Sequence, residues 1–87
     1  MMPTRLDGNV LAGDLREVFA VDVTTARAQC VSCGQVNTLG QVVVYVDGPG
    51  MVARCPGCDA VVLRMAHGPG RAWLDLRGVV CLEVDLP

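Results

Sequence analysis

The chain has 87 residues, of which 52% are apolar and only three are aromatic, and its formal net charge is −2. A core of this size is marginal, so a domain this small often needs a metal, disulfides or a partner chain. Its aliphatic surface also favours a homo-oligomer or a protein partner. Its seven basic residues, all arginine, are spread along the sequence. Binding to a phosphate backbone needs clustered positive charge, so the composition disfavours nucleic acid as a partner.

The opening segment MMPTRLDGN lacks the apolar stretch of a signal peptide, and no apolar run approaches the roughly 20 residues that span a bilayer. We therefore expect a cytoplasmic protein without a membrane segment. Cysteines stay reduced in that compartment. The odd number of cysteines, five, also fits a disulfide framework poorly.

The N-terminal part of the chain predicts one helix. Residues 1–6 are expected to be flexible, and Asp7 or Asn9 can cap a helix by accepting a first-turn N–H. Residues 9–20 have helical periodicity, with apolar side chains gathered on one stripe. That stripe consists of Leu11, Ala12, Leu15, Val18 and Phe19.

A zinc-ribbon hairpin is predicted over residues 24–58. The Val and Tyr content of 41–46 favours a strand. The sequence DGPG at 47–50 is typical of a turn, and 51–54 returns as a second strand. This hairpin would bring the segments on either side of it together.

A three-stranded meander is predicted over residues 60–86. Pairing Ala66 with Arg71 and Leu76 with Val80 makes one face wholly apolar, and the N-terminal helix is the obvious cover for it. The same register places opposite charges across the strands on the outer face. The three strands are 60–66, 71–77 and 80–86.

The outer face of this meander is the best candidate for a binding surface. It would carry Arg64, Trp73 and Glu83 in a row. Trp73 can brace an ordinary surface by stacking on arginine, or it can anchor a partner, since Trp and Arg are enriched in interface hot spots.

The strongest motif is C-x₂-C-x₂₁-C-x₂-C, formed by Cys30, Cys33, Cys55 and Cys58. Two cysteines two residues apart can hold one ion from a tight turn whose N–H groups stabilise the thiolates. Gly34 and Asp59 occupy the position after each turn that often needs a left-handed backbone. Four thiolates surround Zn²⁺ tetrahedrally with no open position, as in a structural site.

Other readings of the cysteines remain open. Iron could occupy a rubredoxin-like site, and the cysteines could instead form disulfides or remain free thiols. A catalytic zinc needs a vacant position, and a thioredoxin-like motif needs a βαβ context that is missing. His67 in HGPG is expected to be an exposed turn residue, although it could serve as a further ligand. Cys81 is expected to be a buried or half-buried small side chain. We find no acid/base pair and predict no catalytic residue.

The chain resembles a bacterial family of short zinc-ribbon-like proteins of unknown function. The matching segments are LDGNVLAGDLREVFAVDVT (6–24), CVSCG (30–34), CPGCDAVVLR (55–64) and WLDLRG (73–78). The resemblance implies zinc at Cys30, Cys33, Cys55 and Cys58, and it implies no activity.

These observations predict a single small α+β zinc-ribbon-like domain over residues 1–87, with the N-terminal helix packed on antiparallel hairpins and a meander. The predicted function is a zinc-stabilised interaction module without enzymatic activity, either a homo-oligomer or the subunit of a complex. A nucleic-acid or transcription-associated ribbon is the main alternative. An enzyme, or a redox or metal-handling protein, is a third reading.

Overall fold

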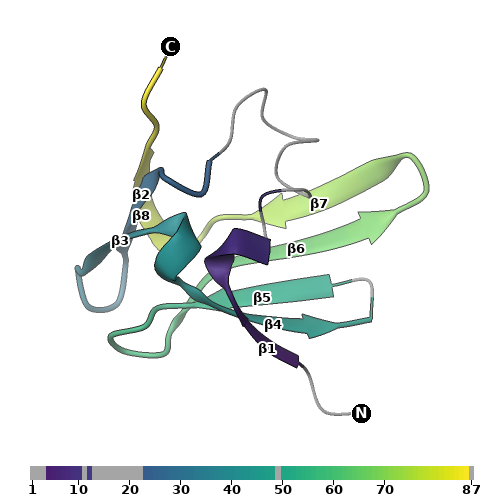
Figure 1. Cartoon of the computed structure of the whole chain (residues 1–87), viewed down its shortest axis with the longest axis horizontal. Coiled ribbons are helices and arrows are strands. Elements are labelled where there is room, and N and C mark those ends of the chain that lie inside the picture. The colour runs from purple at the N-terminus through teal and green to yellow at the C-terminus, as the bar shows by residue number, and fades with distance from the viewer. Residues whose placement is uncertain (1–3, 11, 13–22, 49, 87) are drawn as a thin grey trace.

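The computed structural model describes residues 4–10, 12, 23–48 and 50–86. Eight strands in these ranges form two antiparallel sheets. The larger sheet has the order β1-β4-β5-β6-β7, and the smaller one, beside one end of it, has the order β3-β2-β8 (Figure 1). The strands are β1 (Thr4–Asp7), β2 (Arg27–Cys30), β3 (Val36–Thr38), β4 (Val43–Asp47), β5 (Gly50–Arg54), β6 (Val61–Gly68), β7 (Arg71–Asp75) and β8 (Val79–Glu83). The described protein is therefore mostly β, whereas the sequence predicted an α+β fold.

The beginning of the described chain differs from the prediction. Residues 4–6, expected to be flexible, belong to β1, which pairs with β4. A 3-10 helix, η1 (Gly8–Val10), follows, so the predicted α-helix over 9–20 is wrong at its first two residues. The reason is a tight turn in which the Asp7 carboxylate accepts the N–H of Asn9 at 3.0 Å. Of the remaining residues of the predicted helix only Ala12 is described, and it is α-helical, but the described ranges contain no complete α-helix.

A second 3-10 helix, η2 (Leu39–Gln41), packs closely against η1. A Cβ added to Gly8 would lie 1.5 Å from the carbonyl oxygen of Leu39, so only glycine permits this approach. η2 delays the next strand, which begins at Val43, two residues later than predicted.

The hairpin predicted between the cysteine pairs is confirmed. β4 and β5 pair in antiparallel register, with Tyr45 opposite Val52 and Asp47 opposite Gly50. Gly48 has a φ of 61°, as the tight turn requires. The two segments that carry the cysteine pairs therefore come back to the same end of the sheet.

The predicted register of the next hairpin is wrong by two residues. Ala66 lies opposite Trp73, and Gly68 lies opposite Arg71. The shift arises because β6 continues through His67 and Gly68, which shortens the turn to two residues ending at Gly70, whose φ is 71°. A shift of two residues leaves each side chain on its predicted face, because strand side chains alternate with a period of two.

The predicted meander is also wrong, because β8 pairs with β2 and not with β7. A turn closed by the Val79 N–H on the Leu76 carbonyl leads the chain out of the larger sheet. β8 then runs antiparallel to β2, with Ala28 opposite Leu82. On the surface of this pair, Arg27 forms ion pairs with Glu83 and Asp85. Arg27 reaches these carboxylates only because β2 and β8 pair. The alternation of apolar and polar residues within each strand does not predict which strands pair over so long a separation.

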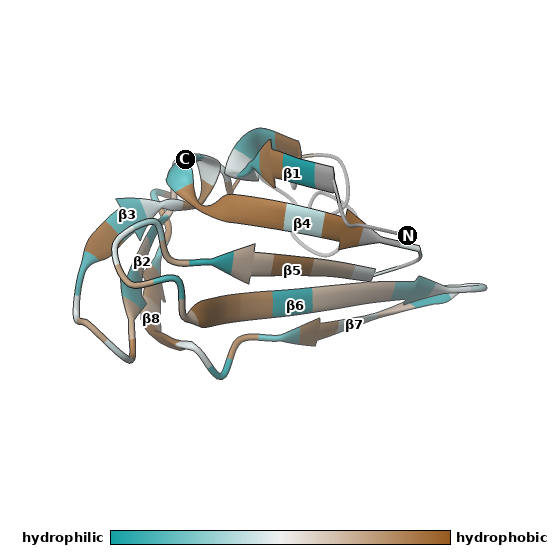
Figure 2. Ribbon diagram, turned by 90° about the horizontal axis from the view of Figure 1, so that it is seen from below, coloured by the Kyte–Doolittle hydropathy of each residue, from teal (hydrophilic) through white to brown (hydrophobic). Residues whose placement is uncertain are grey.

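The core lies on the inner face of the larger sheet. The central strands supply Val44 and Ala53, each 0% exposed, together with Leu63 at 1% and Met65 at 2%. Figure 2 shows apolar colour along β4, β5 and β6, interrupted by hydrophilic bands. Alternate residues of β2, including Ala28, extend this core from the smaller sheet. No helix of the described ranges is long and apolar enough to cross a membrane.

Leu63→Ala should lower the free energy of unfolding by about 2–5 kcal/mol, because it leaves a cavity in the core beside β6. Urea denaturation of the metal-loaded protein measures this loss. Val80→Ala is the matched control, since Val80 is 59% exposed and its truncation should change stability by less than about 0.5 kcal/mol. Equal losses in the two variants would contradict this description of the core.

Candidate metal centre and the open face of the larger sheet

Each cysteine pair lies in the turn of a β-hairpin, and the two turns have the same backbone hydrogen bonds. In the first, the Gly34 N–H donates to the Cys30 carbonyl at 2.9 Å, and the Cys30 N–H donates to the Gln35 carbonyl at 2.9 Å. In the second, the Asp59 N–H donates to the Cys55 carbonyl at 2.9 Å, and the Cys55 N–H donates to the Ala60 carbonyl at 2.8 Å. The first turn joins β2 to β3, and the second joins β5 to β6. We call these two turns the knuckles.

The left-handed position predicted in each knuckle is confirmed. Gly34 has a φ of 78° and Asp59 a φ of 65°. Asp59 is the only non-glycine residue of the described chain in this region. Its carbonyl accepts a hydrogen bond from the Arg54 guanidinium at 2.8 Å, which helps to hold the strained turn.

The knuckles bring the four predicted ligands together. The Sγ atoms of Cys30, Cys33, Cys55 and Cys58 all lie within 4.8 Å of one another. Two distances that link the knuckles, Cys30 to Cys58 and Cys33 to Cys55, are both 3.7 Å. A tetrahedral ion with Zn–S bonds of about 2.3 Å has sulfur–sulfur edges of about 3.8 Å, so these distances fit one tetrathiolate ion. They are too long for disulfide bonds, whose sulfur atoms lie about 2.05 Å apart.

The cluster is buried on one side and exposed to solvent on the other. Cys30 and Cys55 are buried among the core residues, whereas Cys33 and Cys58 are exposed. Backbone N–H groups, first that of Cys33 and then that of Ser32, lower the pKa of the Cys30 thiol to about 7 although burial opposes this. At Cys58 the Ala60 backbone lowers the pKa, but desolvation and the other three thiols outweigh it and raise the pKa to about 12. The thiols thus compete for charge, and a cation is what allows all four to be thiolates together.

Gln35 is a residue of the site that the cysteine spacing does not reveal. Its backbone N–H lies 3.4 Å from the Cys33 sulfur, and its side-chain Oε1 lies 3.8 Å from the Cys55 sulfur. It therefore touches a sulfur of each knuckle. The side chain also covers Gly57, where an added Cβ would lie 1.7 Å from Oε1. The Gly57 N–H in turn points at the Cys55 sulfur at 3.3 Å.

Two other candidate residues lie elsewhere. His67 is a half-buried residue of β6, not an exposed turn residue as predicted, and it is not part of the sulfur cluster. Cys81 is exposed on β8, although a buried or half-buried position was predicted, because β8 turns this residue outward at the border of the smaller sheet. Among the described residues the cluster is therefore closed by four cysteines and has no fifth ligand.

The predicted row of Arg64, Trp73 and Glu83 does not form as such. Arg64 and Trp73 share the outward side of the larger sheet, but Glu83 lies on β8 and pairs with Arg27. One row across the larger sheet consists of Tyr45, Val52, Arg64 and Asp75. This outward side, which we call the open face, has Arg5, Arg54, Arg64 and Arg71 around Tyr45 and Trp73.

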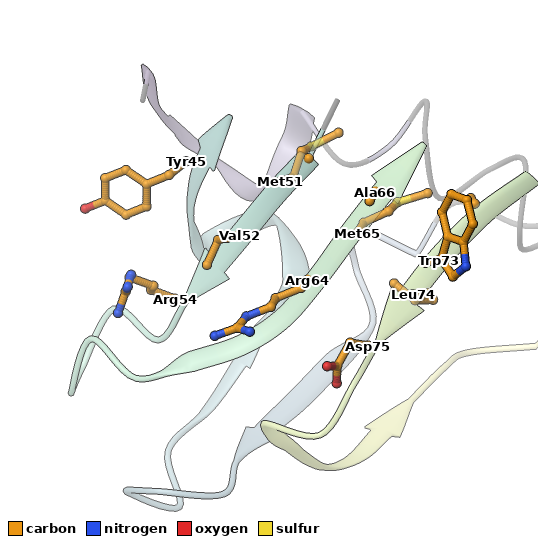
Figure 3. A pocket seen from close by; sticks show the side chains of 12 residues that line it. Tyr45, Met51, Val52, Arg54, Arg64, Met65, Ala66, Trp73, Leu74 and Asp75 are labelled. Carbon is orange, nitrogen blue, oxygen red and sulfur yellow. The ribbon is translucent and has the colours of Figure 1, made fainter. Parts of the chain in front are cut away.

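The open face is hollowed and partly apolar. Trp73 is 57% exposed, and its ring lies over Gly68, where an added Cβ would come within 2.9 Å of it. A pocket in this part of the sheet is lined by both aromatic residues, Val52, Ala66 and Arg64. Figure 3 shows Tyr45, Arg54 and Arg64 extending to one side of the strands, whereas Met51 and Met65 extend to the other.

Asp75 lies at one border of the open face, where Arg77 neutralises it. The guanidinium Nη2 lies 2.6 Å from Oδ2, and the Arg77 backbone N–H donates to Oδ1 at 2.9 Å. First the side-chain and then the backbone hydrogen bond of Arg77 lower the pKa of Asp75 to about 2.

Gln35→Ala should not weaken zinc binding, because its amide oxygen can accept only from a protonated Cys55 thiol, and a zinc-bound thiolate has no proton to donate. The backbone N–H that faces the Cys33 sulfur remains in this variant. Competition with a chromophoric chelator measures the affinity, with Gln41→Ala as the control, because Gln41 bonds the backbone of Thr38 and not a sulfur. A loss of about tenfold in Gln35→Ala alone, the usual effect of removing a partner that supports a ligand, would contradict this expectation.

Arg77→Ala should raise the pKa of Asp75 from about 2 toward its ordinary value. Because folding depresses this pKa, the ion pair stabilises the fold above the ordinary pKa of Asp, near 4, and its contribution is lost as pH falls toward 2. The carboxyl ¹³C shift of Asp75, followed from pH 7 downward, gives both values. An unchanged titration midpoint in the variant would show that Arg77 does not set the pKa.

Comparison with known proteins identifies a family but no characterised relative. The chain has no match among curated proteins or among solved structures. One family model, described as a family of unknown function (DUF6510), matches residues 2–87. This confirms the predicted membership in a family of unknown function. Because the match covers nearly the whole sequence, the chain belongs to the DUF6510 family.

Proposed function

We propose that the protein is a zinc-stabilised interaction module, in which one structural Zn²⁺ holds a small β scaffold that presents a surface to a protein partner. The observation that carries the proposal is the cluster of four sulfur atoms within 4.8 Å, supplied equally by two knuckles. Such a tetrathiolate set, held in ribbon-like hairpins, matches structural zinc centres. Bound zinc would be held by Cys30, Cys33, Cys55 and Cys58, and it would supply cross-linking and not a reaction centre.

The position of the cluster supports a structural role. Cys30 ends β2 in the smaller sheet, and Cys55 follows β5 in the larger one. One ion would therefore fasten the two sheets to each other at the edge of the core. Iron fits thiolates as well, but the described residues place no aromatic side chain around the sulfurs, which weakens the rubredoxin-like reading.

The open face supports the interaction part of the proposal. Its exposed Trp and arginines are the residue types that dominate binding energy in protein interfaces. The proposal includes no catalytic activity, since the cluster offers no open position and the described residues place no acid/base pair beside it. It also places the protein in the cytoplasm, where thiol ligands stay reduced.

Nucleic-acid binding is a second candidate function, and one observation favours it. The arginines that are dispersed in the sequence come together on the open face beside two aromatic side chains, a combination that single-strand binding surfaces use. Binding to a single-stranded oligonucleotide that falls steeply with salt would support this function.

Cys55→Ser should lose the metal and unfold, because zinc affinity at such a site is folding energy. Native mass spectrometry gives the metal content, and far-UV circular dichroism gives the fold. Cys81→Ser is the matched control, since Cys81 is exposed and outside the cluster. The control should keep one zinc per chain and the same spectrum as the unchanged protein.

A folded and fully metallated Cys55→Ser variant would overturn the zinc assignment, as would wild-type protein that purifies folded without zinc. A cluster thiolate that titrates below pH 7 and reacts quickly with zinc bound would favour a redox or metal-handling function instead. Light scattering of the zinc-loaded protein separates a homo-oligomer from a monomeric module that needs another partner.

A further inference from the structure

Among the described residues, the arginines of the open face form no side-chain ion pair, although Arg64 lies opposite Asp75 and interacts with its charge. The ion pairs among the described residues join Arg27 to Glu83 and Asp85, and Arg77 to Asp75. None of them involves an arginine of the open face. Arg54 donates to a backbone carbonyl, that of Asp59, and so keeps its charge.

The charge of this face is opposite to that of the whole protein. The chain has a formal net charge of −2, and four thiolates with one Zn²⁺ would make it about −4. Four of its seven arginines nevertheless share the outward side of one sheet. Two carboxylates share this side: Asp7, two residues after Arg5 on β1, and Asp75, which is paired with Arg77. Such segregation leaves a surface whose complement is negative.

The middle of the open face is partly apolar. Val52 and Ala66 lie on the strands between those that carry Tyr45 and Trp73, and they line the pocket together with Arg64. A ligand that fills this surface therefore needs an apolar part and negative groups close to it. Burial of Trp73, now more than half exposed, would supply much of the binding energy.

We propose that the open face binds an extended acidic segment of a partner protein, with carboxylates on Arg5, Arg64 and Arg71 and an apolar side chain between Tyr45 and Trp73. This inference rests on the proposed function as an interaction module and names the chemistry of its partner. A protein segment can place carboxylates and an apolar side chain alternately, which a nucleic acid cannot do.

The spacing of the aromatic residues favours a protein segment over a single-stranded nucleic acid. Tyr45 on β4 and Trp73 on β7 are three strands apart, so about 14 Å separates them across the sheet. Successive stacked bases are only about 3.4 Å apart, so the two rings cannot stack on neighbouring bases of a continuous stack. Interfaces with nucleic acid are also more polar and more positive than interfaces between proteins, whereas the pocket of this face is lined by Val52 and Ala66 as well as by arginine.

The test uses the zinc-loaded protein and a display library of random peptides of about twelve residues, which leaves a margin beyond the roughly six residues that an extended crossing of the five-stranded sheet requires. Selected peptides should be rich in Glu and Asp around an apolar residue. Labelled with a dye, they should bind in a saturable way by fluorescence anisotropy and should change the emission of Trp73, the only Trp of the chain.

Paired variants test the position of the binding site. Arg64→Gln should weaken binding of a selected peptide by about fivefold, the upper end for an exposed charge pair. Val80→Glu is its control, because it lowers the net charge equally on the smaller sheet and should leave binding unchanged. Trp73→Ala should weaken binding by tenfold or more, whereas Leu86→Ala removes another exposed apolar side chain without effect.

Several results would overturn the proposal. One is a library that enriches no acidic peptides, and another is equal peptide binding by each variant and its paired control. A third is a single-stranded oligonucleotide that displaces the peptides from the wild-type protein but binds the Arg64→Gln variant more weakly. A dimer in solution with Trp73 shielded from quenchers would assign the face to a second copy of the chain. If all variants keep one zinc and the wild-type fold, such results would reject the acidic ligand but not the zinc-stabilised scaffold. A failure of the scaffold appears instead in metal content and circular dichroism.

Discussion

The four sulfur atoms form a point at which side chains of both sheets meet. Cys30 ends a strand of the smaller sheet and Cys55 follows a strand of the larger one, and both reach into the core. The hairpin of β4 and β5 returns the chain to this point, and the knuckles present the sulfurs through matching backbone hydrogen bonds. A core built largely from valine, alanine and leucine is small and therefore only marginally stable. A cross-link at its edge would stabilise both sheets that pack on it.

Local features of the structure could be predicted from the sequence because neighbouring residues determine them. The spacing of the cysteines, the left-handed turn positions at Gly34 and Asp59 and the DGPG hairpin are all of this kind. The slip of two residues between β6 and β7 had little effect on the predicted faces, since a two-residue shift preserves the side of the sheet. The position of η1 was missed because it depends both on the local Asp7 turn and on the close approach of Gly8 to Leu39, which joins segments that are far apart in the sequence.

Long-range pairing explains what could not be predicted. The apolar pattern of β8 fits a meander with β7 as well as it fits the observed pair with β2, and an opposite-charge match exists in either arrangement. The contact of Gln35 with the site could not be predicted for a similar reason, because only the folded chain brings its side chain to Cys55. The arginines looked dispersed, yet strand alternation and sheet order assemble four of them on one side. Charge counted along a sequence therefore says little about charge on a surface.

Arg54 joins the two regions of the molecule that carry its chemistry. Its backbone belongs to β5, its charge belongs to the open face, and its guanidinium holds the carbonyl of Asp59 in the second knuckle. A carboxylate that drew this guanidinium away would remove a support from a turn that a non-glycine residue already strains. A metal held by the cluster and a ligand bound on the open face would therefore influence each other through this one side chain.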